Sequence, residues 1–338
     1  MLRDEILAMP SYAQLLARAD APAGSSWGLF GPADQLGTLN FLSRDSVLGG
    51  VLAVRSGEAF SLDLRSDAIS PSLAPTRQPL EHHIFQRNDF HHDEWIDKLY
   101  TQYGSQIDGL RHIGHPDHGF YNGYDPAEFK PGTELLGIHH FAAAPIAGRG
   151  VLIDLARYCA EVLGAPIDHL KGQAIPVALV DEACAAQGAE ICPGDIVILR
   201  FGWLDYYRHQ APEEIRANLV QNQFHPGLLQ SHDTVAWLWD KRISLIASDN
   251  FALECWPAVP DSPFFTREER ETGVHGAHAG IMHRAILPLL GLPIGELWDV
   301  DALAEACARD RRYDFLLTVS PMPLVGGVGS PANAIALR

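Results

Sequence analysis

The segment PGDIVILRFGW, residues 193–203, decides the fold class of this 338-residue chain. It opens with a Pro-Gly turn, and the β-branched and leucine residues that follow are typical of a strand. Apolar runs of similar length occur in GRGVLIDLAR (148–157) and ISLIASDNF (243–251). We therefore expect each of these three segments to form a short buried strand.

Helical patterns alternate with these strands. The segment 173–188, QAIPVALVDEACAAQG, passes from a short apolar stretch into a helix that Gly188 closes. Further helices are predicted in IMHRAILPLLGL (281–292) and in DVDALAEACARD (299–310), where Asp299 or Asp301 is the expected N-cap. Two more strand-like segments flank this series, SGEAFSLDLRS (56–66) and YDFLLTVSPMPL (313–324).

The alternation continues without a linker, which predicts a single α/β domain over residues 56–338. Residues 1–55 differ in character. They combine a short helix, expected around 11–19, with the Gly/Pro-rich stretch SSWGLFGPADQLGTLNFL (25–42). We expect this irregular N-terminal segment to wrap over the core.

Composition and charge exclude several classes of protein. With 25 Lys+Arg against 42 Asp+Glu, the net charge of −17 opposes nonspecific contact with nucleic acid or with an anionic membrane. The sequence has no apolar run as long as a membrane span, and its first 20 residues do not resemble a secretory signal. The five cysteines lack a CxxC pair, which indicates reduced core thiols: Cys159, Cys184, Cys192, Cys255 and Cys307. The expectation is a soluble, cytoplasmic protein.

The candidate site lies in QYGSQIDGLRHIGHPDHGFY, residues 102–121. Gln106 and Asp108 are two positions apart, so in an extended segment both side chains leave the same face. Gln102 and His112 flank them, with glycines between. Polar and ionisable groups that converge beside flexible glycine are typical of a small-molecule site, although a solvated polar loop is the alternative.

Five segments, taken in order, resemble one known family from about residue 26 to the C-terminus. GSQIDGLRH (104–112) stands where that family carries GTHxDxPxH, and PGDIVILRFGW resembles its PGDxVLxRTGW. The other three are GRGVLIDLAR, HRAILPLLGLPIGELW (283–298) and GGVGSPANAIAL (326–337). The family is that of the cyclase-like metal-dependent hydrolases, which includes bacterial kynurenine formamidase and isatin hydrolase.

This resemblance implies a swivelling β/β/α fold that assembles into a homodimer or homotetramer. It also implies a small-molecule substrate, with water attacking a cyclic amide, an N-formyl amide or a lactone. The metal ligands that it implies are Asp108, Gln102, Gln106, His283 and Glu296. The catalytic group that it implies is His112, supported by Asp108 and Gln106.

The chain departs from the family at two of these positions. Gln102 and Gln106 stand where the family has ligand histidines, and only Asp108 of that motif is retained. A glutamine oxygen is neutral and hard, so it suits Mn²⁺ or Mg²⁺ better than Zn²⁺. Three outcomes remain open: one oxygen-rich divalent site, a site rebuilt from other histidines such as His275, His278 and His283, or a site without metal.

Weaker signals complete the candidate site. Tyr121 and Asn122, beside two glycines, are predicted to line the substrate, as are Phe251 and Trp256 in SDNFALECW (248–256). Asp249 and Glu254 are candidates for orienting His112 or a metal ligand; they too lie in that segment. The histidine-rich stretch HHIFQRNDFHHDEW (82–95) is interpreted as an active-site lid, with a solvated loop as the alternative.

His112 suits proton transfer because an unperturbed imidazole titrates near neutral pH. The sequence therefore predicts a hydrolase of a C–N or C–O bond, with His112 as general acid–base and possible assistance from one divalent metal. Two alternatives stay open. One is a metal-independent cyclase, isomerase or lyase of the same fold, and the other is an inactive homologue that only binds a small molecule.

Overall fold

The computed structural model describes residues 1–218, 224–273, 276 and 278–338. Among these residues, nine strands form one mixed sheet in the order β1-β13-β11-β5-β7-β9-β10-β4-β12. The central strands β5, β7, β9 and β10 run parallel, and the strands on both sides of them pair antiparallel. The predicted α/β fold class is confirmed.

The strands have the following bounds: β1 Ala59–Ser61, β2 Glu81–Asn88, β3 His91–Asp97, β4 Gln106–Asp108, β5 Ile146–Asp154, β6 Ala174–Ile175, β7 Ile196–Arg200, β8 Gly227–Leu228, β9 Leu245–Ser248, β10 Ile294–Glu296, β11 Asp314–Val319, β12 Gly329–Pro331 and β13 Ala334–Leu337. The α-helices have these bounds: α1 Arg3–Leu7, α2 Tyr12–Leu16, α3 Arg44–Ala53, α4 His139–Ala143, α5 Leu155–Arg157, α6 Val177–Gln187, α7 Trp203–Asp205, α8 Glu213–Asn218, α9 His232–Asp240, α10 Arg267–Thr272, α11 His283–Ala285 and α12 Asp301–Asp310. Short 3₁₀ and π turns complete the set: η1 Gly37–Phe41, η2 Tyr121–Gly123, η3 Pro126–Glu128, η4 Tyr158–Val162, η5 Tyr206–Gln210 and η6 Ile286–Leu290.

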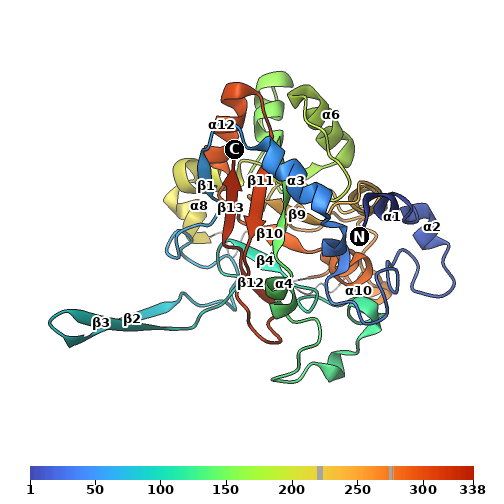
Figure 1. Cartoon of the computed structure of the whole chain (residues 1–338), viewed down its shortest axis with the longest axis horizontal. Coiled ribbons are helices and arrows are strands. Elements are labelled where there is room, and N and C mark those ends of the chain that lie inside the picture. The colour runs from blue at the N-terminus through green and yellow to red at the C-terminus, as the bar shows by residue number, and fades with distance from the viewer. Residues whose placement is uncertain (219–223, 274–275, 277) are drawn as a thin grey trace.

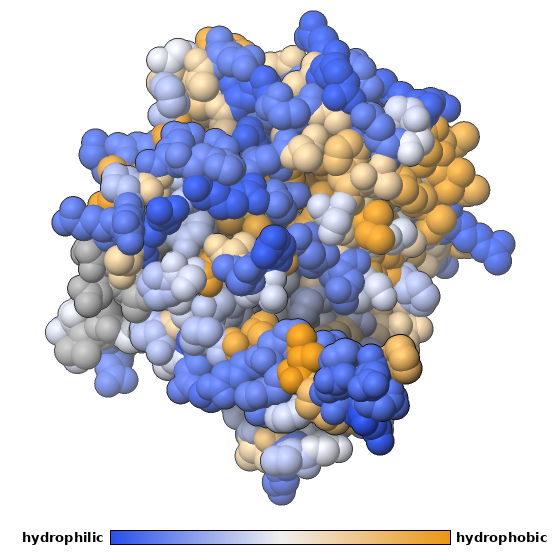
Figure 2. Space-filling view, turned by 90° about the vertical axis from the view of Figure 1, so that its left-hand side faces the viewer, coloured by the Kyte–Doolittle hydropathy of each residue, from blue (hydrophilic) through white to orange (hydrophobic). Residues whose placement is uncertain are grey.

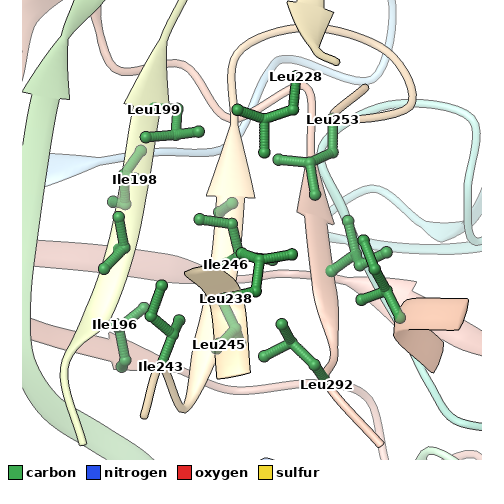
Figure 3. Packing of buried hydrophobic residues seen from close by; sticks show 14 of the residues in the cluster. Ile196, Ile198, Leu199, Leu228, Leu238, Ile243, Leu245, Ile246, Leu253 and Leu292 are labelled. Atoms are coloured by element: carbon green, nitrogen blue, oxygen red, sulfur yellow. The ribbon is translucent and has the colours of Figure 1, made fainter. Parts of the chain in front are cut away.

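The parallel strands are buried on both faces, which explains why they read as unbroken apolar runs in the sequence. Side chains of β7 and β9 meet those of α9 and of the loop before β10 in one continuous core (Figure 3). Helix α3 packs against β5 and β11. A side chain on Gly50 would collide with the Gly148 carbonyl oxygen, so glycine is required where this helix meets the sheet.

The predicted helix ends are partly correct. Helix α6 ends at Gly188, which adopts the left-handed conformation (φ 69°) expected of a C-terminal glycine. The predicted N-cap of α12 is wrong, because Val300 occupies that position and makes no side-chain cap. Both Asp299 and Asp301 instead accept hydrogen bonds from Arg208, so their carboxylates do not cap the backbone amides at the start of α12.

The N-terminal segment lies against α9 and η6. Arg242 donates to the carbonyl oxygen of Met9, and Trp239 donates to that of Pro10. Farther along, Ser26 and Trp27 donate to backbone oxygens of η6. These contacts hold an irregular segment onto the domain, in agreement with the predicted fold. The expected boundary at residue 55 stays a prediction.

Strands β2 and β3 form a separate two-stranded hairpin that extends away from the rest of the molecule (Figure 1). We call residues 81–97 the arm. The face from which it projects is largely hydrophilic, with hydrophobic groups between the polar ones (Figure 2). The interpretation of this stretch as a lid or a solvated loop does not match the structure, because β2 and β3 pair with each other and point outward.

In the described part of the chain, no helix has the length and apolar character needed to cross a bilayer. All five cysteines are free thiols, as predicted.

Candidate active site

Strand β4 brings the predicted motif into the interior of the domain. It lies between β10 and β12, and all three of its residues are buried. Gln106 pairs directly with Glu296, the last residue of β10, and its side-chain amide donates to Glu296 Oε2 at 2.7 Å. Asp108 follows on the same face of β4. Pairing of these two strands thus unites groups that are 190 residues apart in the sequence.

His283 enters the same cluster from the start of α11. Its Nε2 lies 3.2 Å from Glu296 Oε1 and 4.0 Å from Asp108 Oδ2. Its Nδ1 lies 2.6 Å from Glu254 Oε1. Glu254 also accepts from the backbone amides of Met282 and His283, so this buried carboxylate fixes both the ring and the turn that carries it.

Burial and contacts with neighbouring groups have opposite effects on the pKa values in this cluster. Burial would lower the pKa of His283, but hydrogen bonds with Glu254 and Glu296 raise it to about 10. Burial raises the pKa of Asp108, although the nearby His112 and His283 act in the opposite direction. The site therefore concentrates buried ionisable groups with shifted pKa values, as is common at functional sites.

The donor set fits one divalent cation. Asp108, His283 and Glu296 each offer a ligand atom, and these atoms lie within 4.8 Å of one another. Two further oxygens, Oδ2 of Asp108 and Oε1 of Gln106, are buried and have no hydrogen-bond partner among the described residues. Both atoms are acceptors, which a cation would satisfy.

The two glutamines have different contacts. Gln102 donates through its side-chain amide to Oδ1 of Asp108. A side chain on Gly329 would meet Gln102 at 3.1 Å, so the glycine of β12 leaves room for this approach. Gln102 therefore acts here as a hydrogen-bond donor to the carboxylate, while Gln106 both donates to Glu296 and retains a free carbonyl oxygen.

His112 lies at the edge of the cluster, in the loop after β4. Its Nε2 is 3.9 Å from Asp108 Oδ2, and its side chain is 18% exposed, against 1% for Asp108. Burial lowers the pKa of His112, which Asp108 partly offsets. A largely neutral imidazole between the buried carboxylate and the surface is suited to accepting a proton.

Tyr121 and Asn122 have contacts elsewhere. The Tyr121 hydroxyl donates to Asp34 Oδ2, and its ring is fully buried. Asn122 bonds through its side chain with backbone groups of Gly28 and Gly31. These contacts hold the N-terminal segment and involve no residue of the Asp108 cluster, so the predicted substrate-lining role finds no support in them.

The segment after β9 gives mixed results. Phe251 packs beside Leu297, next to the end of β10, and its ring contacts the buried His225 with centroids 5.7 Å apart. Trp256 is partly buried, and its backbone pairs with that of His225. Of the two acidic candidates in this segment, Glu254 reaches His283, as described above. Asp249 instead accepts from the backbone amide of Phe201, so it does not orient His112.

Of the histidines considered as replacement ligands, His275 lies outside the described residues. Burial lowers the pKa of His278, and the charges of His112 and His283 contribute to the lowering. No sequence pattern singles out Arg77, which lies beside this cluster and donates a hydrogen bond to the Gln102 carbonyl oxygen.

A cavity of about 190 Å³ lies at the foot of the arm, lined by Lys98, Tyr103 and Ser105 among others. None of the cluster residues lines it. The Asp108 cluster is the candidate active site, because titratable groups converge there, near the carboxyl ends of the parallel strands β9 and β10.

Comparison with solved structures supports the fold assignment. A crystal structure described as a novel cyclase superposes with a TM-score of 0.78 at 29% identity, covering 93% of this chain and 99% of that one. An isatin hydrolase bound to the product analogue thioisatinate gives 0.54 at 18% identity, covering 88% and 99%. Isatin hydrolase A from Labrenzia aggregata, bound to benzyl benzoate, gives 0.53 at 13% identity, covering 86% and 96%.

No functionally curated protein matched the chain. Residues 66–255 match the family model described as "Putative cyclase". This region contains β4, the parallel strands β5, β7 and β9, and the residues Asp108, His112 and Glu254 of the candidate site. The chain belongs to the cyclase family.

Proposed function

We propose that this protein is a hydrolase that cleaves a C–N or C–O bond in a small cyclic amide, N-formyl amide or lactone. One observation carries the proposal: Asp108, His283 and Glu296 converge in a buried cluster, with the imidazole of His112 beside it. A cluster of acceptors next to a proton-transfer group is what water activation requires.

Each residue of the site has a separate role in this proposal. Asp108, His283 and Glu296 would hold a divalent cation, which would acidify water and polarise a carbonyl group. His112 accepts the proton of the attacking water and returns it to the leaving nitrogen or oxygen. Gln102 orients Asp108, and Glu254 fixes the ring of His283 so that Nε2 faces the cluster.

The likeness to isatin hydrolases supports the hydrolase class of this proposal. The isatin hydrolases share the fold, and their bound ligands, thioisatinate and benzyl benzoate, are small aromatic compounds. The identities of 18% and 13% extend to the fold alone, so the substrate of this chain rests on the site itself.

A metal-independent cyclase, isomerase or lyase is the second candidate. It is favoured by the hydrogen bonds from Gln102 to Asp108 and from Gln106 to Glu296, because these amides pair the two carboxylates without a cation. An inactive homologue that only binds its ligand is the third possibility, and turnover separates it from the other two.

Hydrolysis in ¹⁸O-labelled water tests the proposal. A panel of lactones, cyclic imides and formanilides is incubated with protein depleted of metal and then supplied separately with Mn²⁺, Mg²⁺ or Zn²⁺. We expect incorporation of one solvent oxygen into a product, lost in Asp108→Asn. Conversion without incorporated oxygen would identify the cyclase, isomerase or lyase alternative, and tight binding without any conversion would identify the inactive homologue.

We also propose that the chain assembles into a homodimer or homotetramer through the arm. A two-stranded hairpin is only marginally stable by itself, yet Phe90 at the tip is 97% exposed, and Ile84 and Trp95 are also exposed. A second copy that covers these side chains would stabilise the arm. Light scattering tests this on the intact protein and on a variant with residues 83–95 replaced by a short Gly/Ser linker. If both proteins contain the same number of subunits, the arm is not the assembly interface.

A further inference from the structure

The loop before the arm contains Arg77, whose positively charged guanidinium lies beside the candidate active site. Arg77 is partly buried, and its Nη1 donates to the carbonyl oxygen of Gln102, whose side chain in turn donates to Asp108. The guanidinium lies over the ring of Phe251, 5.9 Å from its centroid. These two contacts, one polar and one aromatic, hold the planar group in place beside the cluster.

Arg77 has no carboxylate partner among the described residues, although acidic residues outnumber basic ones by 42 to 25. Two other partly buried arginines, Arg200 and Arg284, are paired with carboxylates, whereas the buried Arg111 donates to backbone oxygens and to Thr133. Arg200 contacts Asp154 and Asp301, and Arg284 contacts Glu269. Since a guanidinium carries five N–H donors and Arg77 uses one on Gln102, several donors remain for a ligand.

The position of this charge relative to the proton-transfer group is also clear. Burial lowers the pKa of His112, and the charge of Arg77 adds to the lowering. The same holds for His278, where burial is the main cause and Arg77 contributes with the neighbouring histidines. The contacts place Arg77 and His112 beside Asp108: Arg77 reaches it through Gln102, and His112 Nε2 lies 3.9 Å from its Oδ2.

We propose that Arg77 forms an anion subsite of the active site and binds the carboxylate of a small organic acid. The inference rests on the proposed function, since it identifies the substrate as a hydrolysable amide or ester that also bears a carboxylate. A planar, bidentate donor fixed against Phe251 matches the geometry of a carboxylate, whereas the acidic cluster beyond it would repel an anion placed deeper in the site.

The carboxylate has two sources, because hydrolysis of a cyclic amide or a lactone also creates one on the product. Kinetic measurements on the Arg77 variants distinguish the two sources. A substrate carboxylate would make Arg77 important for KM, with matched neutral substrates unaffected. A product carboxylate would make Arg77 important for inhibition by the product, even when the substrate is neutral.

The first experiment measures binding and does not depend on catalysis. Benzoate and the neutral benzyl alcohol are titrated calorimetrically into metal-depleted protein at low salt, using the wild type, Arg77→Gln, Arg77→Lys and the surface control Arg65→Gln. Arg65 is the matched control because it is exposed and paired with Asp67. We expect Arg77→Gln to lose at least tenfold in benzoate affinity, with Arg77→Lys intermediate and Arg65→Gln unchanged.

Wild-type protein that binds benzoate no more tightly than benzyl alcohol would overturn the subsite, as would an Arg77→Gln variant of unchanged benzoate affinity. Melting curves of each variant show whether a loss reflects unfolding. If Arg77→Gln fails to fold, two measurements still show whether Arg77 binds a carboxylate. They are the wild-type comparison of benzoate with benzyl alcohol and the Arg77→Lys titration.

The second experiment compares formanilide with its ortho-carboxylated derivative. Arg77→Gln should raise KM for the carboxylated substrate at least tenfold and leave kcat within a few-fold. If neither compound is hydrolysed by the wild type while benzoate binding depends on Arg77, the proposed function fails and the anion subsite stands. If both are hydrolysed with equal KM in wild type and variant, and product inhibition is unchanged, the subsite fails and the hydrolase stands.

Discussion

His283 Nδ1 lies 2.6 Å from Oε1 of Glu254, a residue 29 positions earlier in the chain. The carboxylate comes from the segment after β9 and the imidazole from the start of α11, so the contact joins two loops that border the site. It directs Nε2 of the same ring toward Glu296 and Asp108. His283 is the only histidine among the described residues of this candidate metal site, and its orientation thus depends on Glu254, which is not one of the candidate ligands.

The first prediction concerns this contact. Replacing Glu254 by glutamine should lower Mn²⁺ affinity and kcat about 10- to 100-fold, because partners of ligand histidines set both tautomer and orientation. Calorimetric Mn²⁺ titration and steady-state kinetics check this, with the exposed Glu268→Gln in α10 as control. Unchanged metal affinity in a folded Glu254→Gln protein would show that the contact is only structural.

The second prediction concerns the proposed general acid–base. His112→Ala should lower kcat at least tenfold, since proton transfer of this kind contributes about 10²–10⁴-fold. His118→Ala, in the same loop but exposed, should retain the wild-type rate. A His112→Ala enzyme as fast as the wild type would remove this residue from the mechanism.

The third prediction concerns the cation. Exhaustive chelation should abolish turnover, and Mn²⁺ or Mg²⁺ should restore it better than Zn²⁺, because the site offers mainly oxygen ligands. Metal analysis of protein purified without added ions, together with rates after each addition, provides the measurement. Full activity of the chelated protein would favour the metal-independent alternative.

The fourth prediction concerns stability and pH. His225 is fully buried between aromatic rings, both ring nitrogens lack a partner among the described residues, and burial lowers its pKa to about 3. Because the folded-state pKa lies below the unfolded one, its contribution to stability is complete above about pH 6.5 and is lost as the pH falls toward 3. The loss amounts to about 1.4 kcal/mol per pH unit within that window.

Urea unfolding at pH 7.5, 6.5, 5.5 and 4.5 tests this linkage. His225→Phe should reduce the pH dependence of the unfolding free energy by about that amount per unit below pH 6. The same change at the exposed His209 should leave the dependence as it is in the wild type. A His225→Phe protein with the wild-type slope would mean that His225 does not titrate in this window.

Much of the fold follows from local sequence. The apolar runs at 148–157, 193–203 and 243–251 became the adjacent parallel strands β5, β7 and β9, because strands buried on both faces need continuous apolar side chains. The arm was not predicted. Its histidines and carboxylates are typical of a polar loop. The hairpin follows from the pairing of β2 with β3, which no local sequence pattern indicates.

The sequence by itself determined the core strands, the family resemblance and the pair Gln106 and Asp108 on one face of an extended segment, because these depend on residue type and on a spacing of two. Tertiary structure alone decided that Glu254 binds His283, that Arg77 donates to the Gln102 carbonyl oxygen, and that Tyr121 and Asn122 contact the N-terminal segment. The physical reason is that strand pairing and loop packing join residues far apart in the chain, and no local pattern records which distant side chain will satisfy a buried polar group.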